Sequence, residues 1–90
     1  MDIGAAITAA KQGKKIARTN WNGQSQFVVF QKGYPEGIPA NKNTSEALNV
    51  EEGTVLKFRP YLMIRTVDGS FVPWLASMSD LLETDWVELD

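Results

Sequence analysis

The 90-residue sequence contains no cysteine and no histidine. Without cysteine, the protein has no disulfide bonds and no thiolate nucleophile. Without histidine, it lacks the commonest general base and the commonest zinc ligand. Any nucleophile, base or metal ligand would have to be Asp, Glu, Lys, Ser, Thr or Tyr, which disfavours a hydrolase or a metalloenzyme. We therefore expect a protein that is not an enzyme and that holds neither a metal ion nor a cofactor.

The chain is also short, and we expect residues 1–90 to form one domain. A folded domain of this length buries only about 60–65% of the surface that its unfolded chain exposes, and such small domains often need a further source of stability. Because disulfides are excluded, we expect the protein to gain that stability by association with copies of itself.

Long apolar runs are missing as well. No stretch approaches the roughly 18–20 apolar residues of a membrane span. The start of the chain lacks the basic region and hydrophobic stretch of a secretory signal. Together with the absence of cysteine, these features indicate a cytoplasmic protein without a membrane partner.

The net charge of the chain is small, but its charged residues are unevenly distributed. The formal net charge is −2. Residues 1–30 carry four basic residues and one acidic residue, whereas residues 61–90 carry one basic residue and six acidic ones. The acidic last third argues against binding along a nucleic-acid backbone, which needs many cations. It permits a small anionic ligand held by one or two cations. The oppositely charged ends either remain solvated or meet when the protein self-associates.

Apolar periodicity predicts a helix at the start of the chain. The apolar positions repeat at helical spacing, namely at Ile3, Ala6, Ile7 and Ala10. Asp2 is the candidate N-cap and Gly13 the candidate residue after the C-cap. So short a helix is unstable alone, so its apolar face must pack against other elements.

Short strands are predicted at residues 16–18, 27–30 and 86–89, and the longest strand signal covers residues 54–67, with a break at Pro60. A turn is expected at residues 20–23. Residues 33–53 are rich in Gly, Pro and Asn, so they are predicted to form a long loop with one helical turn ending at Leu48. A loop of this length is usually functional or part of an oligomer contact.

The last third of the chain gives the strongest local signals. Asp68-Gly69 predicts a hairpin with a two-residue type I′ turn, after which residues 70–74 return as a strand. Ser77 is a candidate helix N-cap, with Asp80 completing a capping box. The sum is an α+β fold, with an antiparallel sheet of about five strands, an N-terminal helix and a short C-terminal helix.

Aromatic residues are the first candidates for ligand contacts. Most of the nine must fill the core of so small a domain, and we expect this of Phe58, Phe71 and Trp86. Trp21 and Trp74 differ, because each stands at a turn beside polar residues or a strand end. A tryptophan in such a place tends to keep one edge exposed, which suits stacking on a nucleobase.

Ser77 and Arg65 are candidates for holding a phosphate group. The N-terminus of a helix offers free N–H groups, and arginine offers a bidentate cation. The alternative is a capped helix with a surface arginine. Asp80 and Glu83 could instead be a catalytic acid–base pair, although helical spacing places them on a face that is expected to be solvated.

Three motifs resemble a known phage and prophage family. They are Gly13-Lys14-Lys15-Ile16-x-Arg18-x-x-Trp21-Asn22-Gly23, the central segment Tyr34-Pro35-Glu36-Gly37-Ile38-Pro39, and Asp68-Gly69-Ser70-Phe71-Val72-Pro73-Trp74-x-x-Ser77-x-x-Asp80. The match covers nearly the whole chain, and the spacing of the tryptophan motifs is specific. The sequence is therefore similar to the Thoeris anti-defence sponge family.

The resemblance implies a homotetramer that sequesters a nucleotide immune signal, glycocyclic ADP-ribose, in pockets between subunits without degrading it. It also implies that cyclic di- or trinucleotides can bind at separate sites, as in some members. Carried over by motif, Trp21 and Trp74 would stack on adenine and ribose, with Phe27 lining the same wall. Polar contacts would come from the remaining motif residues: Asn22 and Asp80 to base or ribose, and Arg65 and Ser77 to the diphosphate.

Two alternatives remain open at this point. One is an enzyme that cleaves such a nucleotide with Asp80 or Glu83. The other is a module that binds single-stranded nucleic acid or a protein through exposed tryptophans.

Overall fold

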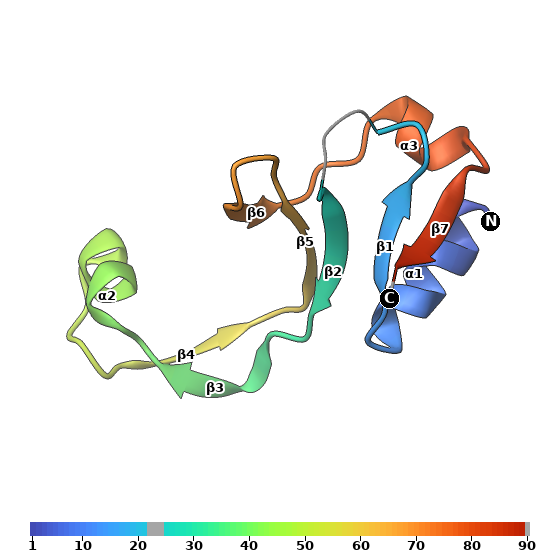
Figure 1. The fold of residues 1–90 in the computed structure, drawn as a ribbon. Helices are drawn as coiled ribbons and strands as arrows, with labels where there is room; N and C mark the ends of the chain where they lie inside the picture. Colours follow the sequence, from blue (N-terminus) through green and yellow to red (C-terminus); the bar gives the residue numbers. More distant parts are fainter. Residues whose placement is uncertain (22–24, 90) are drawn as a thin grey trace.

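The computed structural model describes residues 1–21 and 25–89 and shows an α+β fold (Figure 1). The elements in chain order are α1 (Ile3–Lys11), β1 (Lys15–Arg18), β2 (Phe27–Gln31), β3 (Tyr34–Pro39), α2 (Lys42–Leu48), β4 (Val55–Phe58), β5 (Tyr61–Arg65), β6 (Phe71–Pro73), α3 (Met78–Leu82) and β7 (Trp86–Leu89). The predicted fold class, five-stranded sheet and terminal helices are confirmed. None of the helices in the described part of the chain is long and apolar enough to cross a membrane.

Helix α1 begins and ends where its capping residues predict. The Asp2 carboxylate accepts a hydrogen bond from the backbone N–H of Ala5, at 2.8 Å. After the helix, Gly13 adopts a φ of +94°, and its N–H donates to the carbonyl of Ala10. The following N–H, of Lys14, donates to Ala9, which completes a Schellman-type ending. The predicted boundaries are confirmed.

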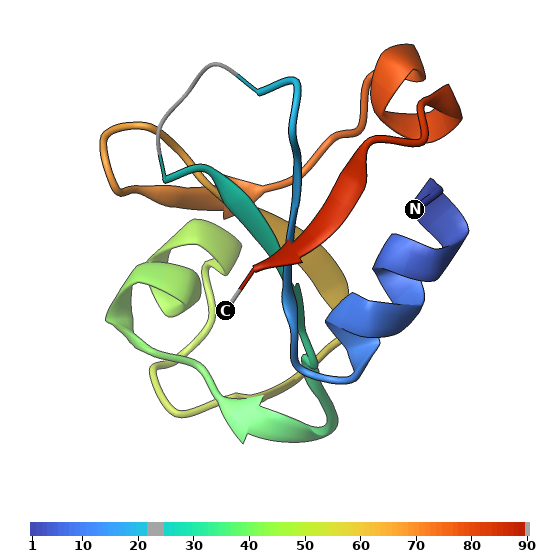
Figure 2. The ribbon, with the colours of Figure 1, turned by 45° about the vertical axis from the view of Figure 1, so that its right-hand side comes forward.

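Five antiparallel strands form the main sheet in the order β6-β5-β2-β1-β7. Because side chains alternate along a strand, Ile16, Val28 and Ile64 share one face. Helix α1 packs on this face (Figure 2), and its alanines allow close approach to Ile16, Val28 and the fully buried Trp86. We call the opposite side the outer face. It carries Phe27, Val29, Met63, Arg65 and Phe71.

Two of the three residues predicted to be core aromatics are not buried. Trp86 is in the core, as expected, but 39% of Phe58 and 50% of Phe71 are exposed. Both predictions fail for the same reason, because the strands that carry these phenylalanines lack a second layer within the described chain. Composition alone cannot reveal which aromatics lie on an uncovered face.

The β5–β6 hairpin is confirmed, but its predicted type I′ turn is wrong. Such a turn requires positive φ at both central residues, and at this turn only Gly69 has one, at +89°. The Gly69 N–H donates to Thr66 and the Thr66 N–H to Ser70, so the loop has three residues. The Asp68 carboxylate accepts hydrogen bonds from the Thr66 hydroxyl, at 2.6 Å, and from the Ser70 N–H, at 2.9 Å, and these bonds fix the longer turn.

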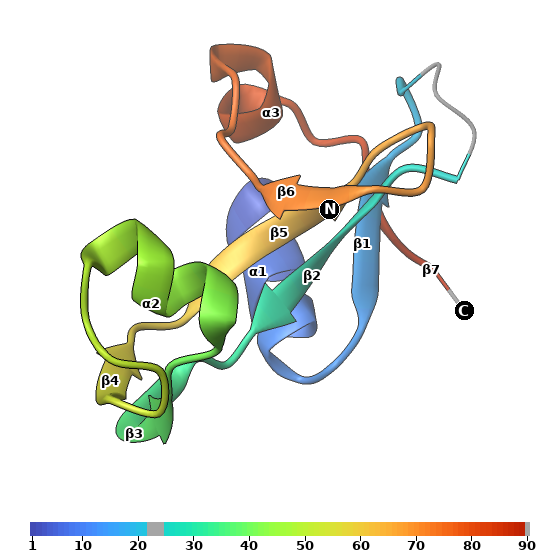
Figure 3. The ribbon, with the colours of Figure 1, turned by 90° about the vertical axis from the view of Figure 1, so that its left-hand side faces the viewer.

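Residues 34–58, which we call the arm, project from the main sheet (Figures 1 and 3). Strands β3 and β4 form a separate two-stranded sheet, and α2 lies between them in the chain. The predicted loop therefore contains a strand and a two-turn helix that Asn41 caps. The prolines in β3 are tolerated because this ladder has only two strands. The arm makes the molecule elongated, with extents of 45 × 26 × 25 Å.

Candidate functional site

Three tryptophans gather at one end of the domain. Trp86 begins β7 and lies between the other two, with ring centroids 5.4 Å from Trp21 and 5.6 Å from Trp74. Both contacts are edge-on, at interplanar angles of 79° and 80°. Trp86 is buried, whereas Trp21 and Trp74 are only partly buried. The arrangement holds two indoles against a fixed third one and leaves part of each accessible.

A buried arginine ties this end of the domain together. The side chain of Arg18 is only 6% exposed. Its guanidinium donates to Asp80, at 2.9 Å, and to Asp85, at 2.8 Å. The second carboxylate also accepts the backbone N–H of Asn20. The segments that carry Trp21, α3 and Trp86 are therefore joined through one cation.

Asp80 is also part of the helix cap, and its burial differs from the expectation. The Ser77 hydroxyl accepts the N–H of Asp80, and the Asp80 carboxylate accepts the N–H of Ser77, at 2.9 Å. The capping box is confirmed. The solvated acidic face is not, because Asp80 is buried while Glu83 is exposed. The ion pair with Arg18 makes this burial possible.

Hydrogen bonding keeps Asp80 ionised despite its burial. Burial alone would raise the pKa of Asp80, but hydrogen bonds from Ser77 and Arg18, with a smaller contribution from Trp21, lower it overall. Hydrogen bonds from Arg18 likewise lower the pKa of Asp85. In return, the two carboxylates raise the pKa of Arg18. The carbonyl of Asp80 accepts the indole N–H of Trp86, at 2.8 Å, so the ion pair and the tryptophans form one network.

The other candidate residues lie on the outer face. Phe27 stands directly across from Arg65 in the ladder between β2 and β5. The ring of Phe27 packs edge-on against Phe71, with centroids 6.1 Å apart, and the amine of Lys15 lies 4.8 Å from its centre. The Arg65 guanidinium donates to the carbonyl of Ser25, at 3.0 Å. This second group combines two aromatic rings with two cations.

The structure therefore divides the predicted site. It brings Trp21, Trp74, Ser77 and Asp80 to the tryptophan end, and it places Phe27 and Arg65 on the outer face of the sheet. The remaining candidate, Asn22, lies outside the described residues. Sequence reasoning missed Arg18 and Asp85 as the connection between the aromatic residues. The available signal was an arginine directly after the apolar residues Ile16 and Ala17 in a predicted strand, since an arginine that is buried with them needs a counter-ion.

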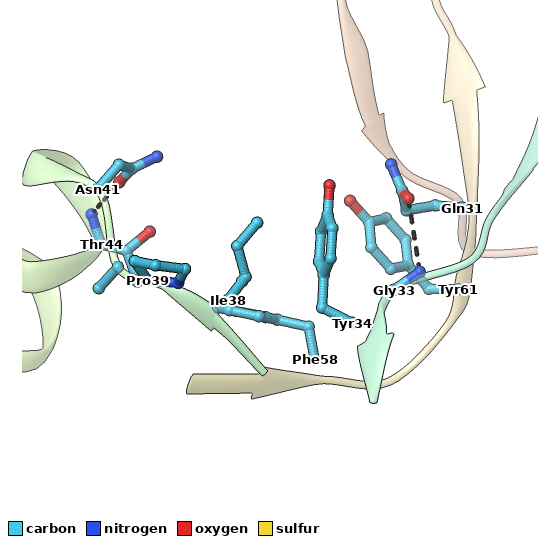
Figure 4. Close-up of a pocket in the computed structure, with 10 residues that line it drawn as sticks. Gln31, Gly33, Tyr34, Ile38, Pro39, Asn41, Thr44, Phe58 and Tyr61 are labelled. Carbon is cyan, nitrogen blue, oxygen red and sulfur yellow. Dashed lines mark hydrogen bonds between the residues drawn. The ribbon is translucent and has the colours of Figure 1, made fainter. Parts of the chain in front are cut away.

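A separate cavity of about 360 Å³ lies where the arm leaves the sheet. Its aromatic wall consists of Tyr34, Phe58 and Tyr61 (Figure 4). In Figure 4 both tyrosine side chains turn their hydroxyl ends toward the open space that separates them from Ile38 and Asn41. None of the predicted site residues that the structure describes lines this cavity.

An antiparallel sheet covered by one helix, with three tryptophans gathered at one end, defines a small α+β domain built around an aromatic cluster. The chain belongs to the family of the Thoeris anti-defense 2-like domain, whose model matches residues 1–89. A relative named Thoeris anti-defense 2, from Bacillus phage SP01, is 27% identical over 86 residues, which cover 96% of this chain and 91% of the relative. The family resemblance is confirmed, and it identifies the protein as an anti-defence protein of the Thoeris type.

Proposed function

We propose that this protein binds the cyclic nucleotide immune signal glycocyclic ADP-ribose in the host cytoplasm and sequesters it without degrading it. The observation that carries the proposal is the pair of partly exposed indoles, Trp21 and Trp74, held against buried Trp86 in a chain of the anti-defence family. Stacking on such rings contributes about 1–3 kcal/mol per base. Capture on the aromatic cluster would block Thoeris immunity by removing its signal.

The polar network supports binding without chemistry. Asp80 is a poor general acid, because its lowered pKa keeps the carboxylate ionised and without a proton to donate. The carboxylate is also already paired with Arg18. The Ser77 oxygen accepts a backbone N–H, which leaves its own O–H free to donate to a phosphate. Asp80 and Asn22 would complete the recognition of base or ribose. A sponge needs affinity only, and this site supplies contacts without an evident nucleophile and base.

The split between the two groups of candidates supports pockets shared between subunits. Phe27 and Arg65 lie on the outer face, away from the tryptophan end of the same chain. In a homotetramer, the outer face of one subunit would supply these residues to the tryptophans of its neighbour. Arg65 would then hold the diphosphate as a charge-assisted contact, worth about 1.5–3 kcal/mol. The same outer face could receive cyclic di- or trinucleotides at a separate position.

Surface area and shape also support an oligomer. The chain exposes 6411 Å², whereas a monomeric protein of this mass exposes about 5,200 Å². The difference exceeds the roughly 800 Å² that each partner buries in a standard interface. The radius of gyration is 15.5 Å, against about 12 Å for a globular chain of 90 residues. A single chain therefore has the excess surface and the elongated shape that are expected of one subunit of an oligomer.

The test is release of the captured signal. Glycocyclic ADP-ribose is incubated with the protein, unbound ligand is removed by filtration, and the protein is then denatured by heat. We expect chromatography to recover intact ligand. Trp74→Ala should lower the amount captured about tenfold or more, since the loss of one stacking contact is worth that factor. Leu75→Ala is the matched control, because Leu75 is the neighbouring residue and is 93% exposed.

Three results would count against the proposal. A cleaved product would identify an enzyme instead of a sponge. Normal capture by a folded Trp74→Ala variant would show that the tryptophan end is not part of the binding site. If that variant fails to fold, by circular dichroism, then Trp21→Ala takes its place. Binding of oligonucleotides that weakens steeply with salt, without capture of the cyclic nucleotide, would indicate a nucleic-acid module.

A further inference from the structure

The two partly exposed tryptophans are held in place by different kinds of contact. Trp74 directly follows β6, and its backbone N–H donates to the carbonyl of Leu62 in β5, at 2.9 Å. Hydrogen bonding to the main sheet therefore fixes the position of Trp74. Trp21, in contrast, lies three residues beyond the end of β1 and belongs to no strand or helix. Contacts other than strand pairing must hold Trp21.

The segment that carries Trp21 is attached to one ion pair. Within the described chain, the backbone N–H groups of residues 19–21 donate only to atoms of Arg18 and Asp85. The N–H of Thr19 donates to the Asp85 carbonyl, that of Asn20 to the Asp85 carboxylate, and that of Trp21 to the Arg18 carbonyl, at 3.1, 3.1 and 3.2 Å. The Arg18 guanidinium in turn donates to the Asp85 carboxylate, at 2.8 Å. The position of Trp21 therefore depends on this pair.

Arg18 can influence Trp21 but is too buried to contact a ligand itself. It is the last residue of β1 and pairs with Trp86 in the ladder between β1 and β7. Its side chain is only 6% exposed, and its Nε and Nη1 atoms donate to Asp85 and Asp80. Figure 1 shows α3, which contains Asp80, beside the end of β1 and the start of β7. Any effect of Arg18 on binding must therefore pass through the residues that it holds.

The chemistry of the pair suits it to holding a segment at a fixed angle. A guanidinium is planar and presents its N–H groups in a rigid fork, so two of its nitrogens hold the carboxylates of Asp80 and Asp85 at the same time. Hydrogen bonding from Arg18 lowers the pKa of Asp85, which therefore stays ionised. An ionised carboxylate accepts the N–H of Asn20 in a charge-assisted hydrogen bond, which is stronger than a neutral one.

We propose that Arg18 and Asp85 are positioning residues of the candidate site, because their ion pair holds the Trp21 indole where it can stack on the ligand. The main sheet fixes Trp74, and the ion pair sets the other indole, edge-on against Trp86. The effect on affinity rests on the proposed function, whereas the hold on Trp21 does not. Disruption of the pair should weaken binding even in a variant that stays folded.

A double-mutant cycle separates positioning from stability. Asp85→Asn, which removes the charge but keeps the side-chain shape, should weaken the binding of glycocyclic ADP-ribose about three- to tenfold. Isothermal titration calorimetry measures this at a temperature at which every variant is folded. In the Trp21→Ala background the same change should have almost no further effect, because Asp85 acts through Trp21. Glu83→Gln is the matched control: Glu83 lines the same surface hollow as Asp85, but its described contacts do not include residues 19–21. An equal loss of affinity with and without Trp21 overturns the proposal.

A second measurement needs no ligand. The indole N–H groups give separate signals in ¹⁵N NMR spectra, which single Trp→Phe variants assign. Arg18→Lys keeps the charge but loses the fork, so it should shift the Trp21 signal and leave the Trp74 signal nearly in place. If Arg18→Lys fails to fold, Asp85→Asn supplies this measurement as well. A Trp21 signal that does not move, or one that moves no more than that of Trp74, overturns the proposal. If the Trp21 signal moves but the wild type binds no glycocyclic ADP-ribose, the proposed function fails and the hold on Trp21 stands.

Discussion

At the scale of single residues, Arg18 and Asp80 connect stability to the candidate site. One guanidinium bonds two carboxylates, and Asp80 also caps α3 and accepts the indole of Trp86 through its carbonyl. A substitution at Asp80 therefore disturbs the ion pair, the helix cap and the aromatic cluster at the same time. Residues with several partners of this kind show large effects when substituted, because each partner left behind is buried and unpaired.

Asp80→Asn should lower the free energy of unfolding by about 2–3 kcal/mol at neutral pH, since it removes the charge that faces a buried guanidinium. The native pKa of Asp80 is lowered. Its stabilising effect is therefore complete above the unfolded pKa, near 4, and is lost as the pH falls through the lower native value. Urea unfolding at pH 7 and pH 3 should show a gap between wild type and variant that narrows in acid.

Glu83→Ala is the matched control for this comparison. Glu83 is an acid at the end of the same helix, but it is exposed and forms no ion pair within the described residues. We expect its stability to stay within about 0.5 kcal/mol of wild type. An equal gap for Asp80→Asn at both pH values would show that its carboxylate charge is unimportant.

At the scale of elements, local capping signals predicted the structure well. Asp2, Gly13 and Ser77 mark helix ends where expected, because each acts through hydrogen bonds to residues nearby in the chain. Pro60 separates β4 from β5 for the equally local reason that it lacks an N–H. The sequence predicts a loop at residues 33–53, and so misses β3, because β3 finds its partner strand β4 across more than fifteen residues. Pairing at that distance leaves little trace in composition.

The candidate site was predictable only in part, for a similar reason. The sequence distinguished Trp21 by its polar neighbours and Trp74 by its place at the end of a predicted strand, but it could not show that both pack against Trp86. Nor could it show that Phe27 faces the other side of the sheet, because that depends on which face α1 covers. Alternation along a strand fixes which residues share a face, while tertiary packing decides which face is inside.

The two ends of α1 offer a paired test at this scale. Gly13→Ala should destabilise the protein by about 1–2 kcal/mol, because φ there is +94°, a backbone conformation that is unfavourable for alanine. An added Cβ has no atom within 4 Å, so neither a clash nor a new contact alters this backbone cost. Gly4→Ala should stabilise it by about 0.5 kcal/mol, because the position is helical and an added Cβ meets only an ordinary contact with Asp2. Thermal unfolding measures both. Effects of the same sign would contradict this account of the helix ending.

At the scale of the whole molecule, the protein has too much surface for its mass. Its buried apolar core consists mainly of alanines with Ile16, Val28 and Trp86. An elongated chain with so small a core and many half-exposed aromatic residues is stabilised best by copies that cover the arm and the outer face. Assembly and stability should then depend on the same contacts.

Stability should therefore depend on protein concentration. We expect Tm to rise by about 3–6 °C for each tenfold increase in concentration, because mass action favours the assembled state. Differential scanning fluorimetry across two decades of concentration measures this. A wild-type Tm that does not change with concentration would indicate a monomer.

The gathering of all three tryptophans at one end also has an optical consequence. The chain has no other tryptophan, and the indoles meet edge-on at centroid distances of 5.4 and 5.6 Å. Excitation energy passes readily between rings so close together, so the intrinsic emission reports on one location instead of an average over the fold. Coupled indoles also give paired bands of opposite sign in far-ultraviolet circular dichroism, where the indole transition is strong. The protein thus carries a built-in spectroscopic probe beside the surface where its ligand is proposed to stack.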